Sequence, residues 1–176
     1  MKRGLFWLLT VVTLAIYGTM VAWSLPHISA EAGGLAPFDM RPTGYSFEEA
    51  RAFLAALSAE GNAFYRSVQH KLDLLFPGMM AAVLYFAVAA LLPRRLGIWR
   101  HAIAASMILT AVFDYAENSA VAAMLAAGAD GLTREMAETA NMWSTTKATV
   151  STVAYSLLLI LLIWKGVALW RRRSRA

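Results

Sequence analysis

Four long apolar stretches constrain what this chain can fold into. A bilayer core of about 30 Å requires about 20 consecutive apolar residues in a helix. The stretches of sufficient length are 5–25, 74–92, 98–127 and 148–170. Only 15% of the 176 residues are charged, whereas soluble domains carry about 25%. The sequence therefore predicts an all-α integral membrane protein, a four-helix bundle built as a single domain over 1–176.

The composition excludes several other classes. The chain has no Cys, which excludes a disulfide scaffold and Cys-based catalysis.

Lys2 and Arg3 precede the first stretch, as they would in a secretory signal. Its apolar run of about 21 residues is longer than that of a signal peptide, however. We therefore expect 5–25 to be a retained membrane span.

The distribution of charge predicts the orientation of the spans. Lys and Arg gather on the cytoplasmic side of membrane proteins. If both termini are cytoplasmic, the inner ends of the spans hold ten of the 16 Lys and Arg residues and none of the 11 acids. These ten are Lys2, Arg3, Arg94, Arg95, Arg100, Lys165, Arg171, Arg172, Arg173 and Arg175. The basic tail is therefore interpreted as a topology anchor that contacts anionic lipid, not as a nucleic-acid arm.

The first outer loop, 26–60, is predicted to contain one short amphipathic helix. Ser46 and Glu49 have the spacing of a capping box. The helix that follows places Phe47, Phe53 and Leu54 on one face, suited to the outer leaflet or to a lid over the bundle. The second helix is expected to begin near 62 and the fourth after 133, so helices two to four extend beyond the outer face.

Ionisable residues in the predicted spans coincide in depth. Asp73, Asp114, Glu117 and Lys147 lie 16 to 19 residues from the inner end of their helices, which is roughly 24–29 Å at 1.5 Å per residue. Charged groups at such depth cost several kcal/mol unless they are paired, so they indicate a functional site. The coincidence predicts one polar cluster near the outer membrane boundary.

Ideal helical periodicity places most of these residues on shared faces. Arg66, His70, Asp73 and Pro77 share one face of the second helix, and Asp114, Glu117 and Asn118 share one face of the third. A polar stripe on the fourth helix comprises Asn141, Thr145, Thr149, Thr152 and Ser156. The acidic faces and this stripe are expected to point into the bundle. Lys147 falls on the other side of the fourth helix and matches the cluster in depth only.

Pro77 adds a backbone feature to the cluster. Proline has no N–H, so the carbonyl of Asp73, four residues earlier, loses its helical partner. The sequence therefore predicts a kink and a free acceptor that faces the cluster. Broken helices build binding sites in transporters, although they also simply bend ordinary spans.

The cluster suits acid–base chemistry on a membrane-embedded molecule. Asp114 and Glu117 are the predicted acid–base pair, with Asp73 as an orienting carboxylate. Arg66, with Lys147, is predicted to bind an anionic group, and His70, Asn118, Asn141 and Thr145 complete the predicted substrate-binding set. No cofactor and no metal are assigned.

Three alternatives remain open. His70, Asp73, Asp114 and Glu117 resemble part of a di-metal carboxylate set, but a second His is missing and Arg66 would repel a cation. Acids in spans also mark proton paths, but the inner half offers few ionisable groups. Finally, the cluster could serve only to hold the helices together, in an accessory or scaffold subunit of a membrane complex.

The sequence thus predicts a small-molecule or lipid-headgroup site on the outer face of a bacterial inner-membrane protein. The predicted partners are membrane lipid, a lipid or small amphiphile as ligand, and a membrane protein or a second copy of the chain. No nucleic acid is expected. The segments 38–42, 72–77 and 114–118 identify no family.

Overall fold

A computed structural model describes residues 3–174 of the chain. Lys2 and Arg175, which the orientation prediction includes, lie outside this range. The fold is all-helical, with 87% of residues in helices, and residues 3–174 contain no strand. The helical elements of the bundle are α1 (Arg3–Thr19), η1 (Met20–Ser24), α2 (Leu25–Glu31), α4 (Ala59–Phe64), η3 (Tyr65–Gln69), α5 (His70–Leu91), α6 (Trp99–Ala105), α7 (Ile108–Gly131) and α8 (Arg134–Arg173). Two short 3₁₀ segments, η2 (Phe38–Met40) and η4 (Arg94–Leu96), and the helix α3 (Phe47–Ala56) lie in the loops.

Three helices are long and apolar enough to cross a membrane. They are the continuous helices Arg3–Glu31, Ala59–Leu91 and Arg134–Arg171. The fourth predicted span, 98–127, is not one helix, because a break at 106–107 separates α6 from α7. At the break, the hydroxyl of Ser106 bonds to the carbonyl of Ile103 and that of Thr110 to Met107. Such local bonds compete with the helical ladder and bend helices.

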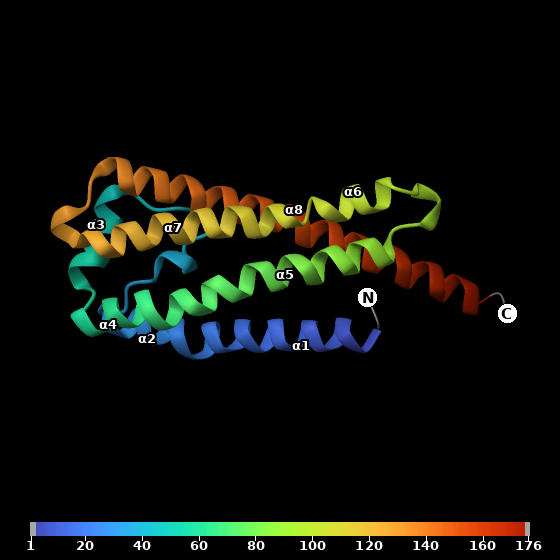
Figure 1. Cartoon of the computed structure of the whole chain (residues 1–176), viewed down its shortest axis with the longest axis horizontal. Coiled ribbons are helices and arrows are strands. Elements are labelled where there is room, and N and C mark those ends of the chain that lie inside the picture. The colour runs from blue at the N-terminus through green and yellow to red at the C-terminus, as the bar shows by residue number, and fades with distance from the viewer. Residues whose placement is uncertain (1–2, 175–176) are drawn as a thin grey trace.

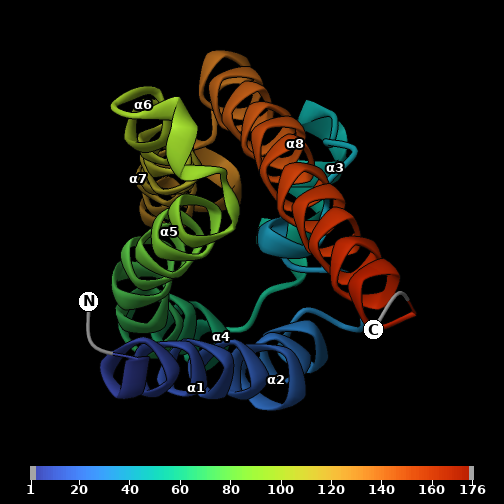
Figure 2. The same cartoon turned by 90° about the vertical axis from the view of Figure 1, so that its right-hand side faces the viewer.

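The long helices run side by side with α5 near the centre (Figure 1). α5 packs against α1, α6, α7 and α8, and α7 and α8 form the most extensive helix pair. α1 and α8 make few contacts with each other, and Figure 2 shows them on separate sides of the bundle. This arrangement leaves the two helices facing each other across the interior.

One end of the bundle, the head end, carries α2, α3 and α4 (Figure 1). An apolar core built around Phe38, Phe53 and Met124, all fully buried, packs α3 and the loop 32–46 onto α7 and α8. The predicted capping box is confirmed, because Ser46 and Glu49 each bond to the other's backbone N–H. The helix α3 therefore caps the bundle through its apolar face.

The opposite end, the basic end, is where α1 begins, α5 ends, α6 begins and α8 ends (Figure 1). A second apolar core lies in this half, between α5, α6, α7 and α8, and includes Leu84, Val88 and Leu161. The first and last described residues both lie at this end. The two apolar cores flank the region that holds the predicted polar cluster.

Candidate functional site

The centre of the polar cluster is a lysine shared by two carboxylates. The Nζ atom of Lys147 on α8 lies 2.5 Å from Glu117 Oε2 and 3.3 Å from Asp114 Oδ1, both on α7. The side chains of Glu117, Asp114 and Lys147 are only 3%, 13% and 23% exposed. This ion-paired triad joins the two most extensively packed helices of the bundle.

The position of Lys147 corrects the prediction for the fourth helix. The inward face of α8 holds Ser144, Lys147 and Ala154, whereas Thr149, Thr152 and Ser156 of the polar stripe are exposed. The hydroxyls of Thr149 and Thr152 donate to the carbonyls of Thr145 and Ala148, four residues earlier in the same helix. Because these hydroxyls are satisfied within the helix, the stripe does not have to face the interior.

The remaining two residues of the stripe hold a loop in place. The Oδ1 atom of Asn141 accepts a hydrogen bond of 2.9 Å from the backbone N–H of Tyr45. Gly44, with φ of 90°, lies against the side chains of Asn141 and Thr145. Asn141 and Thr145, predicted to bind substrate, thus position the loop 42–46 on α8.

Two side chains of α7 form hydrogen bonds with backbone groups of α5 near Pro77. The amide of Asn118 donates to the carbonyl of Asp73 (3.2 Å) and to the carboxylate of Asp114 (3.1 Å). The hydroxyl of Tyr115 donates to the carbonyl of Leu74 (2.9 Å) and accepts from the N–H of Gly78 (3.1 Å). The sequence predicts that the carbonyl of Asp73 is a free acceptor. This prediction is wrong, because the carbonyl is paired with Asn118.

Asp73 itself is connected to the first helix. Gln69 donates through Nε2 to Asp73 Oδ1 (2.9 Å), and Gln69 Oε1 accepts a hydrogen bond from Ser24. Ser24 and Gln69 end the two π-helical turns η1 and η3, which contact each other. Such turns widen a helix and are frequent at functional sites. Asp73 has no ion-pair partner among residues 3–174.

The loop adds two charged residues that sequence reasoning missed. Asp39, in η2, accepts a hydrogen bond from the hydroxyl of Tyr65. Arg41 donates two hydrogen bonds to the carbonyl of Ala36 (2.9 and 2.8 Å), and its guanidinium lies 5.6 Å from the ring centre of Phe53. The loop thereby brings one further carboxylate and one further cation to the cluster.

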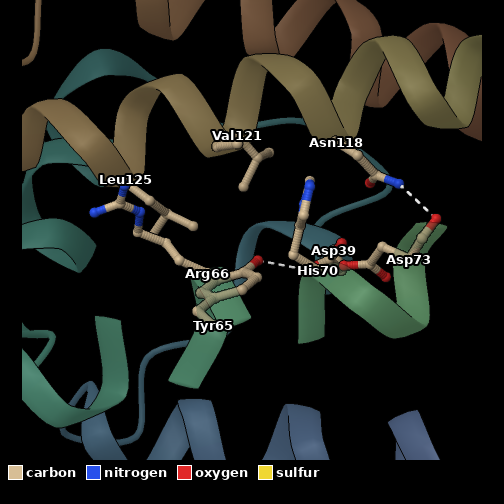
Figure 3. Close-up of a pocket in the computed structure, with 9 residues that line it drawn as sticks. Asp39, Tyr65, Arg66, His70, Asp73, Asn118, Val121 and Leu125 are labelled. Atoms are coloured by element: carbon tan, nitrogen blue, oxygen red, sulfur yellow. Dashed lines mark hydrogen bonds between the residues drawn. The ribbon is translucent and has the colours of Figure 1, made fainter. Parts of the chain in front are cut away.

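Arg66 and His70 are placed differently from the prediction. Both are exposed, whereas Tyr65 and Gln69 are buried. The π turn at 65–69 takes more residues per turn than an α-helix, and Gln69, not Arg66 or His70, is the buried residue of this turn beside Asp73. Figure 3 shows the guanidinium of Arg66 near Leu125, away from Asp39 and Asp73. Arg66 and His70 line a small pocket of about 200 Å³ whose wall includes Asp39 and Asp73.

A larger cavity of about 560 Å³ lies on the other side of Asp39 and Asp73, inside the bundle. Its charged lining consists of Asp39, Arg41, Asp73, Asp114, Glu117 and Lys147. Its apolar lining comes from the first helix, α5 and α8 and includes Leu14, Tyr17, Phe76, Met80 and Tyr155. Ligand pockets commonly have volumes of about 300–1,000 Å³. The cavity thus combines a charged end with an apolar side and is large enough for a small organic molecule.

Two buried hydroxyl groups near the charged end lack a hydrogen-bond partner among the described residues. They belong to Tyr45 and Ser144, which are 7% and 3% exposed. Burial raises the pKa of the Tyr45 phenol well above its ordinary value, so the group stays protonated. Ser144 lines the cavity. The Ser144 hydroxyl nevertheless lies near both the Tyr45 phenol and the Glu117 carboxylate, so these groups form one polar contact region at the charged end.

The carboxylates of the cluster differ in their partners. Among residues 3–174, no group of three or more His, Asp and Glu side chains is arranged to hold a metal ion. Asp39 and Asp73 have carboxylate oxygens without a cationic partner, next to the triad of Asp114, Glu117 and Lys147. Comparison with protein-family models, curated proteins and solved structures finds no match.

Proposed function

We propose that the 560 Å³ cavity binds a membrane-soluble amphiphile with a cationic or hydrogen-bond-donating head group. The observation that carries this proposal is the two-part lining of the cavity, with carboxylates at one end and apolar side chains of α1, α5 and α8 along its side. A molecule with a polar head and an apolar body matches both parts.

The excess of carboxylates over cations in the cavity lining favours a cationic head group. Four carboxylates, those of Asp39, Asp73, Asp114 and Glu117, line the cavity against two cations. Lys147 is already paired with Asp114 and Glu117, so it does not offer a free charge to an anion. This geometry argues against the anion-binding role predicted for Lys147 and favours a cationic ligand.

The packing of the helices supports entry of the ligand into the cavity from the side of the bundle. α1 and α8 both line the cavity but make few contacts with each other. In a membrane, an opening between them faces lipid, because the outward faces of both helices carry exposed apolar residues such as Val12, Leu159 and Ile163. The apolar body of the ligand would lie in this opening.

The membrane placement is part of the same proposal. α6 and α7 would form a fourth crossing beside the three apolar helices, with the carboxylates of α7 neutralised in part by Lys147. The head end would face outward and the basic end the cytoplasm, consistent with the positive charge of the latter. We propose a bacterial inner-membrane location on the same grounds.

Acid–base processing of the bound molecule would use the same residues. Of the three carboxylates that α5 and α7 contribute to the cavity, Asp73 has a hydrogen bond from Gln69 but no ion pair, and Asp114 and Glu117 are held by Lys147. We expect Glu117→Gln to abolish binding or turnover while the protein still folds, because the amide keeps the shape of the side chain. A variant that only unfolds would contradict this role.

The proposal is tested by native mass spectrometry of the protein released from its own membranes. Ser151 lines the cavity, so Ser151→Phe fills part of it without changing a charge. Ser156→Phe is the matched control, because Ser156 is exposed on the same helix. We expect an organic adduct of defined mass on the wild type and the control, and none on Ser151→Phe. A folded wild-type chain without an adduct, or an adduct that persists in Ser151→Phe, would contradict the proposal.

A purely structural role is the second candidate, in an accessory subunit of a membrane complex. It is favoured by Lys147, Tyr115 and Asn118, which all connect neighbouring helices through polar contacts. It leaves the cavity without a role. Conduction is less favoured, because the apolar core around Leu84, Val88 and Leu161 occupies the path towards the basic end.

A further inference from the structure

The basic end of the bundle contains a second large cavity, of about 610 Å³. It lies between the start of α1, the end of α5 and the start of α6, which Figure 1 shows together at the right. Its polar lining is Arg3, Tyr85, Arg94, Arg100 and His101. Its apolar lining is Phe6, Phe86, Ala89 and Ala90. The cavity is separate from the proposed amphiphile site at the head end and shares no residue with it.

The positive charge of this cavity has no acidic counterpart in its own half of the molecule. The segments 3–30, 74–113 and 139–174, which build the basic half, contain no Asp or Glu. Three arginines therefore face one cavity without a carboxylate that could neutralise them. This differs from the cavity at the head end, where Lys147 has two acidic neighbours and Arg41 has a backbone acceptor.

Hydrogen bonds to His101 determine where the remaining donors point. Arg100 Nη2 lies 3.2 Å from His101 Nε2, and Tyr85 Oη lies 3.0 Å from His101 Nδ1. A guanidinium is only a donor, so Nε2 must accept and Nδ1 must carry the proton. Nδ1 then donates to Tyr85 Oη. The proton of the Tyr85 hydroxyl is therefore free to donate to a ligand.

We infer that this cavity binds the phosphate group of an anionic phospholipid. Guanidinium groups match phosphate oxygens with paired hydrogen bonds, and basic pockets between membrane helices bind lipid head groups. The three arginines and Tyr85 supply donors on one side of the cavity. Phe6, Phe86 and the two alanines supply an apolar wall for the first methylenes of the acyl chains.

The test measures lipid binding to the full-length, delipidated protein in detergent. Native mass spectrometry follows the titration of phosphatidylglycerol, of phosphatidylcholine with the same chains, and of inorganic phosphate as a competitor. The pocket variant is Arg94→Gln with Arg100→Gln. The control variant is Arg171→Gln with Arg173→Gln, which removes the same charge from exposed residues at the end of α8.

We expect phosphatidylglycerol to bind the wild type and the control at least about tenfold more tightly than it binds the pocket variant. Tyr85→Phe, which keeps every charge, is expected to weaken binding about threefold through the loss of one donor. Equal loss in the pocket and control variants, or equal affinity for the two lipids, would overturn the inference. Displacement of phosphatidylglycerol by stoichiometric inorganic phosphate would overturn the assignment to a lipid.

Discussion

At the head end of the bundle, four carboxylates lie around one cavity, and two of them share a buried lysine on a neighbouring helix. At the basic end, three arginines line a cavity of similar size, and the segments that form this half of the bundle contain no acidic residue. The charges of the head end hold helices together, whereas those of the basic end remain available to a partner. We therefore propose that the two sets of charges serve different purposes, the first for stability and the amphiphile site and the second for contact with lipid.

The largest expected effect is on stability, and it compares the replacement of one lysine in the head-end cluster with the replacement of one lysine near the basic end. Lys147→Met removes the cation that Asp114 and Glu117 share, and breaking a buried pair costs about 3–5 kcal/mol. Lys165→Met, at an exposed position on the same helix, should change stability by less than about 0.5 kcal/mol. Thermal unfolding in detergent measures both. Equal effects would show that the triad does not stabilise the fold.

A second, smaller effect tests the loop that closes the head end. Gly44→Ala places a methyl group against Asn141 at a positive φ, and we expect a loss of about 2–3 kcal/mol. Gly33→Ala is the control, because Gly33 also has positive φ but open space around it; it should cost about 1 kcal/mol. Unfolding midpoints of the two variants separate the clash from the backbone strain. If the two variants lose the same stability, the loop does not pack on α8 as described.

The hydrogen bonds of Tyr115 to the backbone beside Pro77 should contribute about 1 kcal/mol to stability. Tyr115→Phe leaves the N–H of Gly78 and the carbonyl of Leu74 without their bridging hydroxyl. Tyr155→Phe removes a phenol that makes no hydrogen bond within residues 3–174 and serves as the control. The two are compared by thermal unfolding. A larger loss in Tyr155→Phe than in Tyr115→Phe would contradict the bridging role.

The smallest effect depends on pH and concerns the exposed cap of α3. The hydrogen bond from the backbone N–H of Ser46 lowers the pKa of Glu49 below its ordinary value of 4.5. Its contribution to stability is therefore complete above the ordinary pKa and is lost as the pH falls through the lowered one. Unfolding midpoints of the wild type and Glu49→Gln should differ at neutral pH and converge in acid. Glu138→Gln, at an exposed site, should show no such pH dependence.

The sequence predicts those features that depend on local patterns. Local residue types are enough to predict three of the four apolar helices, the capping box at Ser46 and the start of the last helix after 133, where the hydroxyl of Thr133 accepts a hydrogen bond from the N–H of Met136. Asp73, Asp114 and Lys147 also lie around one cavity of the bundle, as expected from their similar distances along their helices.

The features that the sequence does not predict depend on rotation about a helix axis or on long-range contacts. Gln69 in the π turn, and not Arg66, is the buried partner of Asp73, and α8 turns Lys147 inward while its threonines bond within the helix. Asp39 reaches the cluster only because Phe38 anchors its loop in the core beneath α3. The Phe38–Pro42 segment, an aromatic and two charges in a loop, is the one local signal of this contact.

The charge preference of the head-end cavity tests the central claim most directly. Native mass spectrometry of the detergent-solubilised protein can compare decylammonium with decanesulfonate, which have the same chain and opposite head groups. The account predicts one bound decylammonium with at least about tenfold higher affinity, lost in Ser151→Phe and kept in Ser156→Phe. Equal or tighter binding of decanesulfonate, or binding of decylammonium that Ser151→Phe leaves unchanged, would contradict it.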